Sequence, residues 1–163
     1  MADYTDIRNG VKNSLQMISK AKGYLTDIPA GRVSYPYAPI QNMRPGYDGC
    51  PVIYLWVEGT SYSKGEDGES VHGRLHKVTE FMGVACFSIL PENALEEGQT
   101  QPSLEELSGN FQLDLERWAR QNDRVAGARQ LNLLNVGDTL GESATSVLVA
   151  FSFSVEYSSA APY

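Results

Sequence analysis

Two histidines and two cysteines are the residues of this sequence whose types could support catalysis or metal binding. His72 and His76 are four positions apart, so both could face one side of a strand and bind a zinc ion together. A zinc site needs further ligands, and Cys50 and Cys86 lack the close spacing of zinc-binding cysteines. We therefore predict no metal site, and interpret the histidines as exposed residues at the ends of a loop.

The acidic run GEDGES, residues 65–70, resembles a calcium-binding loop only in its charge. It lacks the ligand positions of an EF-hand and no helical pattern flanks it, so we interpret it as a solvated loop. Glu80, Glu105 and Asp114 could act as acids or bases. Glu105 and Asp114, however, fall on the side of a helix away from its apolar stripe, which favours solvated charge.

The sequence also lacks the motifs of common nucleophilic and nucleotide-binding sites. It has no Gly-x-Ser-x-Gly elbow, no Walker-type phosphate loop and no Gly-x-Gly-x-x-Gly between a strand and a helix. We therefore predict no catalytic residues and no cofactor, and do not expect an enzyme. The alternative from another class is a small hydrolase or ligand-binding domain, with a pocket under a proline-rich loop and His72 or His76 as its base.

Composition and charge limit the classes of protein to which the chain can belong. The 163 residues are 42% hydrophobic and 20% charged, which predicts one folded domain over residues 1–163. The net charge is −7 and the pI is near 4.8, so we do not expect binding to nucleic acid through many phosphate contacts. No apolar run reaches the roughly 20 residues of a membrane helix and no secretion signal is recognisable, so we expect a soluble, unexported protein with reduced thiols.

Apolar periodicity predicts two helices. The first is expected from Asp3 or Thr5 to Lys22, because apolar residues recur there at spacings of three and four. The second begins at Ser103, which forms a capping box with Glu106. Its apolar stripe consists of Leu104, Leu107, Phe111, Leu115 and Trp118.

Strict alternation of apolar and polar residues predicts a long antiparallel strand over Thr145–Tyr157. Further strands are expected near residues 32–35, 51–58, 75–90 and 130–136. The dry face of the long strand carries Val147, Val149, Phe151, Phe153, Val155 and Tyr157.

The segments between these strands complete the predicted fold. Residues 51–58 are almost continuously apolar, so this strand is expected mid-sheet with both faces covered. Residues 59–73 are predicted to form a long flexible loop, residues 137–143 a turn, and Gly83 a bulge. The order helix, strands, helix, strands predicts an α+β fold, with two helices packed on one face of a mainly antiparallel sheet.

This order of elements resembles the tail terminator, or tail-completion, proteins of long-tailed bacteriophages. The resemblance covers nearly the whole chain. It runs from an N-terminal helix through GYLTDI, RVSY, a proline-rich loop, PVIYLWVEG and a flexible insertion to LEELSGNFQLDLERW, QLNLLNV and VLVAFSFSVEY.

The resemblance implies a structural virion protein of the tail and neck, assembled in the host cytoplasm. Such a chain would form a homo-oligomeric ring, typically a hexamer, on the last ring of tail-tube subunits. The ring would end tube growth and form the tail-side interface to the head–neck connector or stopper protein. DNA would pass through it without specific binding, as an acidic surface favours. A head-completion protein, a stopper or a tube subunit is the alternative within this class.

The resemblance supplies no shared catalytic motif, so the expected partner contacts come from residue types. The flexible insertion and the proline-rich segment are the first candidates, because loops that fold on assembly and exposed tyrosines are both common at interfaces. Packing over a sheet edge is the alternative for the tyrosines of the proline-rich segment. Four arginines near the end of the second helix could bind an acidic partner or a neighbouring copy, or complement the helix dipole. The candidates are Tyr62, Lys64, Asp67 and Glu69, then Tyr35, Tyr37 and Tyr47, then Arg117, Arg120, Arg124 and Arg129.

Overall fold

The computed structural model describes residues 3–37, 45–63, 74–140 and 145–160. Within these ranges the chain forms two α-helices, five strands and several single 3-10 turns. In chain order the helices and strands are α1 Tyr4–Leu15, β1 Val33–Ser34, β2 Val52–Ser63, β3 Arg74–Ser88, α2 Leu104–Gln121, β4 Gln130–Leu140 and β5 Ser146–Ala160.

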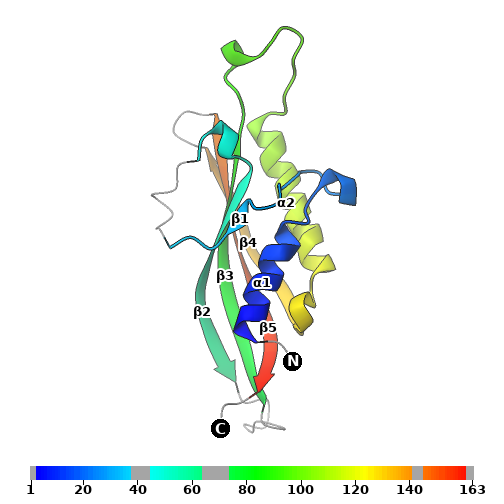
Figure 1. The fold of residues 1–163 in the computed structure, drawn as a ribbon, viewed down its shortest axis with the longest axis vertical. Helices are drawn as coiled ribbons and strands as arrows, with labels where there is room; N and C mark the ends of the chain where they lie inside the picture. Colours follow the sequence, from blue (N-terminus) through cyan, green and yellow to red (C-terminus); the bar gives the residue numbers. More distant parts are fainter. Residues whose placement is uncertain (1–2, 38–44, 64–73, 141–144, 161–163) are drawn as a thin grey trace.

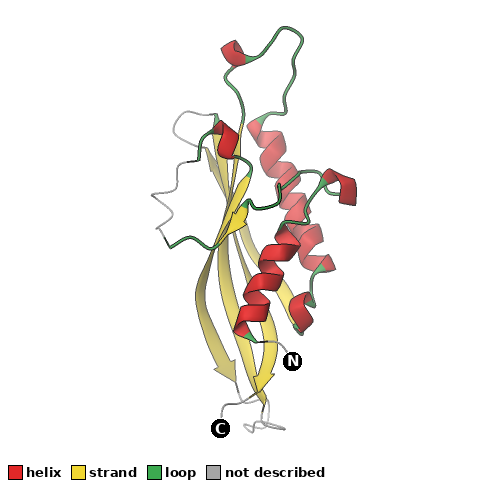
Figure 2. Ribbon diagram, in the orientation of Figure 1, coloured by secondary structure: helices red, strands yellow, loops and turns green. Residues whose placement is uncertain are grey.

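The described strands form one sheet in the order β1-β2-β3-β5-β4. The short β1 pairs with β2 in parallel, and every other pairing is antiparallel. Both helices lie on the same side of this sheet (Figures 1 and 2). The predicted α+β fold, with a mainly antiparallel sheet and two helices on one face, is confirmed.

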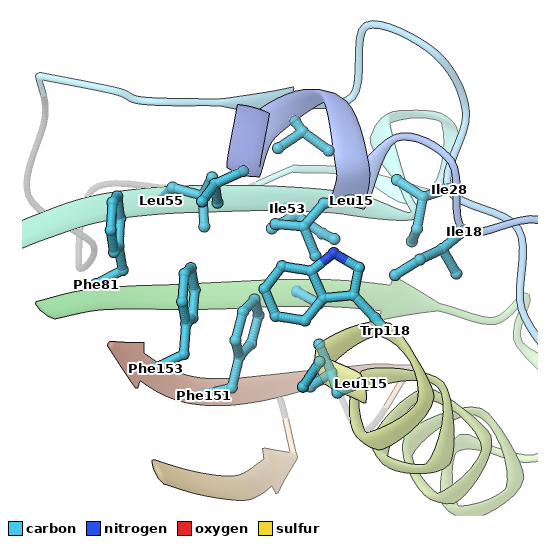
Figure 3. Packing of buried hydrophobic residues seen from close by; sticks show 14 of the residues in the cluster. Leu15, Ile18, Ile28, Ile53, Leu55, Phe81, Leu115, Trp118, Phe151 and Phe153 are labelled. Atoms are coloured by element: carbon cyan, nitrogen blue, oxygen red, sulfur yellow. The ribbon is translucent and has the colours of Figure 1, made fainter. Parts of the chain in front are cut away.

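The core lies between the helices and the dry face of β5. All six apolar residues of the alternating run, from Val147 to Tyr157, are at most 2% exposed. On the central strands the ring of Phe81 stacks on that of Phe153 with centroids 4.9 Å apart, and Trp118 meets Phe153 edge-on at 5.1 Å (Figure 3). The period-two pattern therefore predicted both the strand and the face that it buries.

Gly83 does not form the predicted bulge. It stays in register between Leu55 on β2 and Phe151 on β5. A Cβ atom at this position would lie 2.3 Å from the tip of the Phe151 ring, so the glycine leaves the space that the ring occupies. The irregularities in register lie elsewhere, at Glu58 on β2 and at Leu134 on β4.

The first helix is shorter than predicted. It begins after Asp3, which forms a capping box with Asp6, but it ends at Leu15 rather than at Lys22. The chain then folds back on itself, because the backbone N–H of Ile28 donates to the carbonyl of Ile18 at 2.8 Å. Ile18 is therefore buried like the apolar residues of α1, although it lies beyond the end of the helix.

Both predicted loop boundaries were also wrong, because two strands run on into polar sequence. β2 continues through Gly59–Ser63, which pairs with β3, and β4 continues to Leu140. The rest of the expected loop, residues 64–73, and of the expected turn, residues 141–143, lies outside the described residues. Pairing with neighbouring strands therefore determines where β2 and β4 end, although the composition of both segments is typical of a loop.

The interpretation of Asp114 as a solvated charge was wrong, whereas Glu105 is exposed as expected. The Asp114 side chain is 2% exposed. Its carboxylate accepts hydrogen bonds from the backbone N–H groups of Leu25 and Thr26, each at 2.8 Å, and from the Thr26 hydroxyl at 2.5 Å. The segment that joins α1 to β1 is thereby held against α2.

Two further side chains of α2 bind the same segment. Arg117 donates to the carbonyl of Gly23, and Gln121 accepts a hydrogen bond from the Tyr24 hydroxyl at 2.8 Å. Gly23 has φ +88°, a left-handed conformation that glycine adopts without strain. One face of α2 therefore fixes a connection that has little regular structure of its own.

Replacing Gly83 tests the close packing of Phe151. Gly83→Ala should lower the free energy of unfolding by about 1–3 kcal/mol, because the added methyl group displaces a buried ring. Gly137→Ala is the matched control on β4, where a Cβ atom meets nothing within 4 Å. It should change stability by about 0.5 kcal/mol or less. Equal effects of the two substitutions in urea unfolding would contradict this packing.

Replacing Asp114 tests the hydrogen bonds that hold the α1–β1 connection. Asp114→Ala should cost about 2–4 kcal/mol in urea unfolding, because it leaves the N–H groups of Leu25 and Thr26 without an acceptor. Asp114→Asn should cost less, since its one carbonyl oxygen can still accept. Glu116→Ala, at an exposed position on the same helix, is the control and should be nearly neutral.

Candidate assembly surfaces

The face of the sheet opposite the helices carries aromatic and apolar side chains. Among the described residues no helix lies on this face (Figure 2). Tyr54 and Trp56 on β2 are half-buried there, with ring centroids 6.3 Å apart, and Met82 pairs with Trp56 from β3. We call this side the open face. Its aromatic residues are of the types that interface cores prefer.

The expectation that residues 51–58 are covered on both faces was therefore wrong. Ile53 and Leu55 are fully buried under the helices, whereas Tyr54 and Trp56 alternate with them on the open face. A strand with aromatic side chains on its open face has the same continuous apolar sequence as a strand that is buried on both faces. Sequence reasoning missed Tyr54 and Trp56 as candidate contacts for this reason.

Both edges of the described sheet offer backbone groups for pairing. β4 is an edge strand, and its outward residues include Leu134, 49% exposed, and Leu140, 65% exposed. On the other side β1 pairs only with Ile53 and Tyr54, so the rest of the outer edge of β2 has no partner in the described chain. Unpaired edges are templates for β-strand addition, although the irregularity at Leu134 partly blunts one of them.

An open groove of about 790 Å³ lies between the end of α2 and β4. Its charged lining comprises Arg120, Arg124 and Arg129 together with Glu116 and Asp123. Three guanidinium groups against two carboxylates make it locally basic on a chain whose net charge is −7. We call it the arginine groove, and its charge suits a carboxylate-bearing partner.

Two predicted contacts, Arg120 and Arg124, therefore come together, and Arg129 joins them from the start of β4. The groove exists because α2 ends at Gln121 and a short turn, Val125–Gly127, redirects the chain into β4. Arg117 does not belong to it. Its guanidinium lies 5.1 Å from the centroid of the Tyr24 ring and binds the α1–β1 connection instead.

The end of β2 carries another predicted contact, Tyr62, which is 65% exposed. The Lys77 ammonium lies 5.7 Å from the centroid of its ring, a cation–π distance. The ends of β2 and β5 extend past the N-terminal end of α1 (Figure 1). Lys64, Asp67 and Glu69 lie outside the described residues.

The tyrosines near the proline-rich segment differ in environment. Tyr37 is fully exposed and Tyr47 is half-exposed, so both are free to meet a partner. Tyr35 packs instead: its hydroxyl donates to the carbonyl of Arg8 at 2.8 Å, the Arg8 guanidinium lies 4.3 Å from its ring centroid, and burial raises its pKa. The packing interpretation therefore holds for Tyr35.

The predicted contacts do not form one site. Tyr47 precedes β2 and Tyr62 lies near its far end, while the arginine groove is on the flank formed by α2 and β4. Any partner that contacts all of them must reach several sides of the protein. Neighbouring copies in a ring could do so, because each copy is contacted on two different sides.

The geometry removes His76 from the hydrolase alternative. A small pocket of about 230 Å³ does lie beside the proline-rich segment, with Tyr47, Pro51 and Ser88 in its lining. His76 lies twelve residues before Ser88 on β3, roughly 40 Å away at the rise of a strand. His72 lies outside the described residues.

The described residues contain no group of three or more His, Cys, Asp or Glu side chains arranged to hold a metal ion. None of the described helices has the length and apolar character needed to cross a membrane. No protein-family model matches this chain, and neither does any curated protein.

Reversing charge in the arginine groove tests whether it is an interface. Arg120→Glu with Arg124→Glu should weaken self-association at least tenfold in sedimentation measurements, because the groove then repels an acidic partner. Lys20→Glu with Lys22→Glu makes the same change in net charge outside the groove and is the matched control. Equal dissociation constants for the two double variants would exclude the groove as a contact surface.

Proposed function

We propose that this chain is a structural protein of a long-tailed bacteriophage virion, acting as a tail terminator. In this role, copies of the chain assemble into a closed ring, typically a hexamer, on the end of the tail tube. The ring stops tube growth and provides the surface that meets the head–neck connector or stopper protein. The proposal rests on the order of elements and on the surfaces that the protomer leaves uncovered.

The observation that carries the proposal is the one-sided coverage of the sheet. Two helices bury one face. The part of the open face around Tyr54 and Trp56 remains available in the described chain, as do the edge of β4 and the edge of β2 beyond its short pairing with β1. Half-buried Tyr54 and Trp56 on that face, and Leu134 and Leu140 along the β4 edge, are apolar side chains that neighbouring copies would cover. These features suit a subunit whose exposed apolar side chains are covered by neighbouring copies.

A ring also requires two different surfaces that complement each other. The α2–β4 flank offers the arginine groove, and the opposite flank offers the outer edge of β2 with the exposed carboxylate of Glu58. Contacts between unlike surfaces generate closed rings when the rotation between copies closes. An attraction between the basic groove and the Glu58 carboxylate would favour head-to-tail contact over contact between two grooves.

The net charge fits a channel for DNA. At −7 per protomer, a ring carries a strong negative field that repels the phosphate backbone. DNA can then pass through the ring without binding to it. A tube subunit, the alternative within the same class, would share this property but would assemble into open stacks.

Mixing the protein with purified tail tubes tests the proposal. Negative-stain images should show density at one end of each tube, and added tube subunits should no longer extend that end. Tyr62→Ala should reduce the fraction of capped tubes, because the exposed ring is a contact, whereas Tyr62→Phe should retain capping. Tubes that stay uncapped and continue to grow would refute the proposal, and filaments of this chain alone would identify a tube subunit.

A further inference from the structure

The two cysteines of the chain lie in contact although they are far apart in sequence. Cys50 follows the single turn Tyr47–Gly49 and lies two residues before β2, while Cys86 is near the end of β3. Their Sγ atoms are 3.4 Å apart, and both thiols are free. The register of the sheet explains this proximity, because Cys86 pairs with Val52, two residues after Cys50.

The two thiols differ in access to solvent. Cys86 is only 3% exposed, on the side of β3 away from the helices, whereas Cys50 is half-buried at the beginning of β2. Cys50 is therefore the more accessible residue of the two to a small reagent. In such a pair the accessible thiol attacks a small disulfide, and the buried thiol then attacks the resulting mixed disulfide.

The surroundings of Cys50 also favour its thiolate. The pKa of Cys50 is lowered to about 7, chiefly by a hydrogen bond from Cys86. Burial opposes this shift, and the Ser88 hydroxyl and the Arg32 guanidinium contribute to it. The same hydrogen bond, together with burial, raises the pKa of Cys86. At neutral pH the reactive form is therefore concentrated on the accessible sulfur.

We propose that Cys50 and Cys86 are a disulfide-forming modification site that reacts with low-molecular-weight disulfides such as oxidised glutathione. The Cys50 thiolate attacks one sulfur of the small disulfide and expels one thiolate, which leaves a mixed disulfide on Cys50. Cys86 loses its proton to solvent, attacks the Cys50 sulfur and expels the second small thiolate. The protein loses two electrons and two protons, and one small disulfide becomes two thiols.

The product would tie the turn Tyr47–Gly49 and the start of β2 covalently to β3. Because the bond closes a loop between residues 36 positions apart, it should stabilise the folded state mainly by restricting the unfolded chain. The sequence predicted free cysteines without a disulfide framework, because no local sequence pattern shows that two residues so far apart lie in contact. The inference concerns the chain itself and does not rest on the proposed function.

Oxidised glutathione, added to the reduced full-length protein at neutral pH, tests the proposal by intact mass and alkylation. The expected product has lost two hydrogen atoms, no longer reacts with iodoacetamide, and yields one peptide pair joined through Cys50 and Cys86. Its thermal midpoint should rise by roughly 5–10 °C over that of the reduced protein. Two thiols that stay alkylatable, or a disulfide between two copies of the chain, would overturn the proposal.

Single variants separate the roles of the two sulfurs. Cys86→Ser should accumulate one glutathione adduct on Cys50, because no second thiol resolves it. Cys50→Ser should stay unmodified while folded and react only after unfolding, since Cys86 is buried. The wild-type alkylation rate should rise with pH to a midpoint near 7, which a merely structural pair would not produce. Equal reactivity of the two folded variants would refute the assigned roles.

Discussion

Trp118 on α2 contacts both α1 and the sheet, and the fold depends on these two contacts. The side chain is fully buried, meets the ring of Phe153 on β5 edge-on, and donates its indole N–H to the Ser14 hydroxyl of α1 at 2.9 Å. Large aromatic residues stabilise a core most when their polar atom also has a partner. One residue of α2 therefore fixes both helices over the central strands (Figure 3).

Placing both helices on one side of the sheet determines what the rest of the protein can do. The helices cover the dry face of β5, whereas Tyr54 and Trp56 face away from the helices. The edge of β4, and the edge of β2 beyond its short pairing with β1, also have no partner strand in the described chain. These surfaces are the ones that the proposed ring assembly would use.

The sequence could predict the elements whose patterns are local. Alternation identified β5 and its buried face. The N-cap Ser103, which accepts a hydrogen bond from the Glu106 backbone N–H, identified α2 together with the apolar stripe; of the predicted capping box, the structure shows this bond alone. It could not predict that α1 ends at Leu15 or that Asp114 is buried, because the partners of Asp114 lie 88 and 89 positions away. Contacts across the fold decide these features. Arg120 and Arg124 could be grouped because both lie near the end of α2 in the sequence, but the groove that contains them requires β4.

The most direct test of the account is the mass of the protein in solution, measured by light scattering over a wide range of concentrations. The account predicts a rise from the 17.9 kDa protomer to a plateau at the mass of one closed ring, because contacts between unlike flanks are then all used. A mass that remains that of the protomer at every concentration, or one that grows without a plateau, would contradict a closed ring.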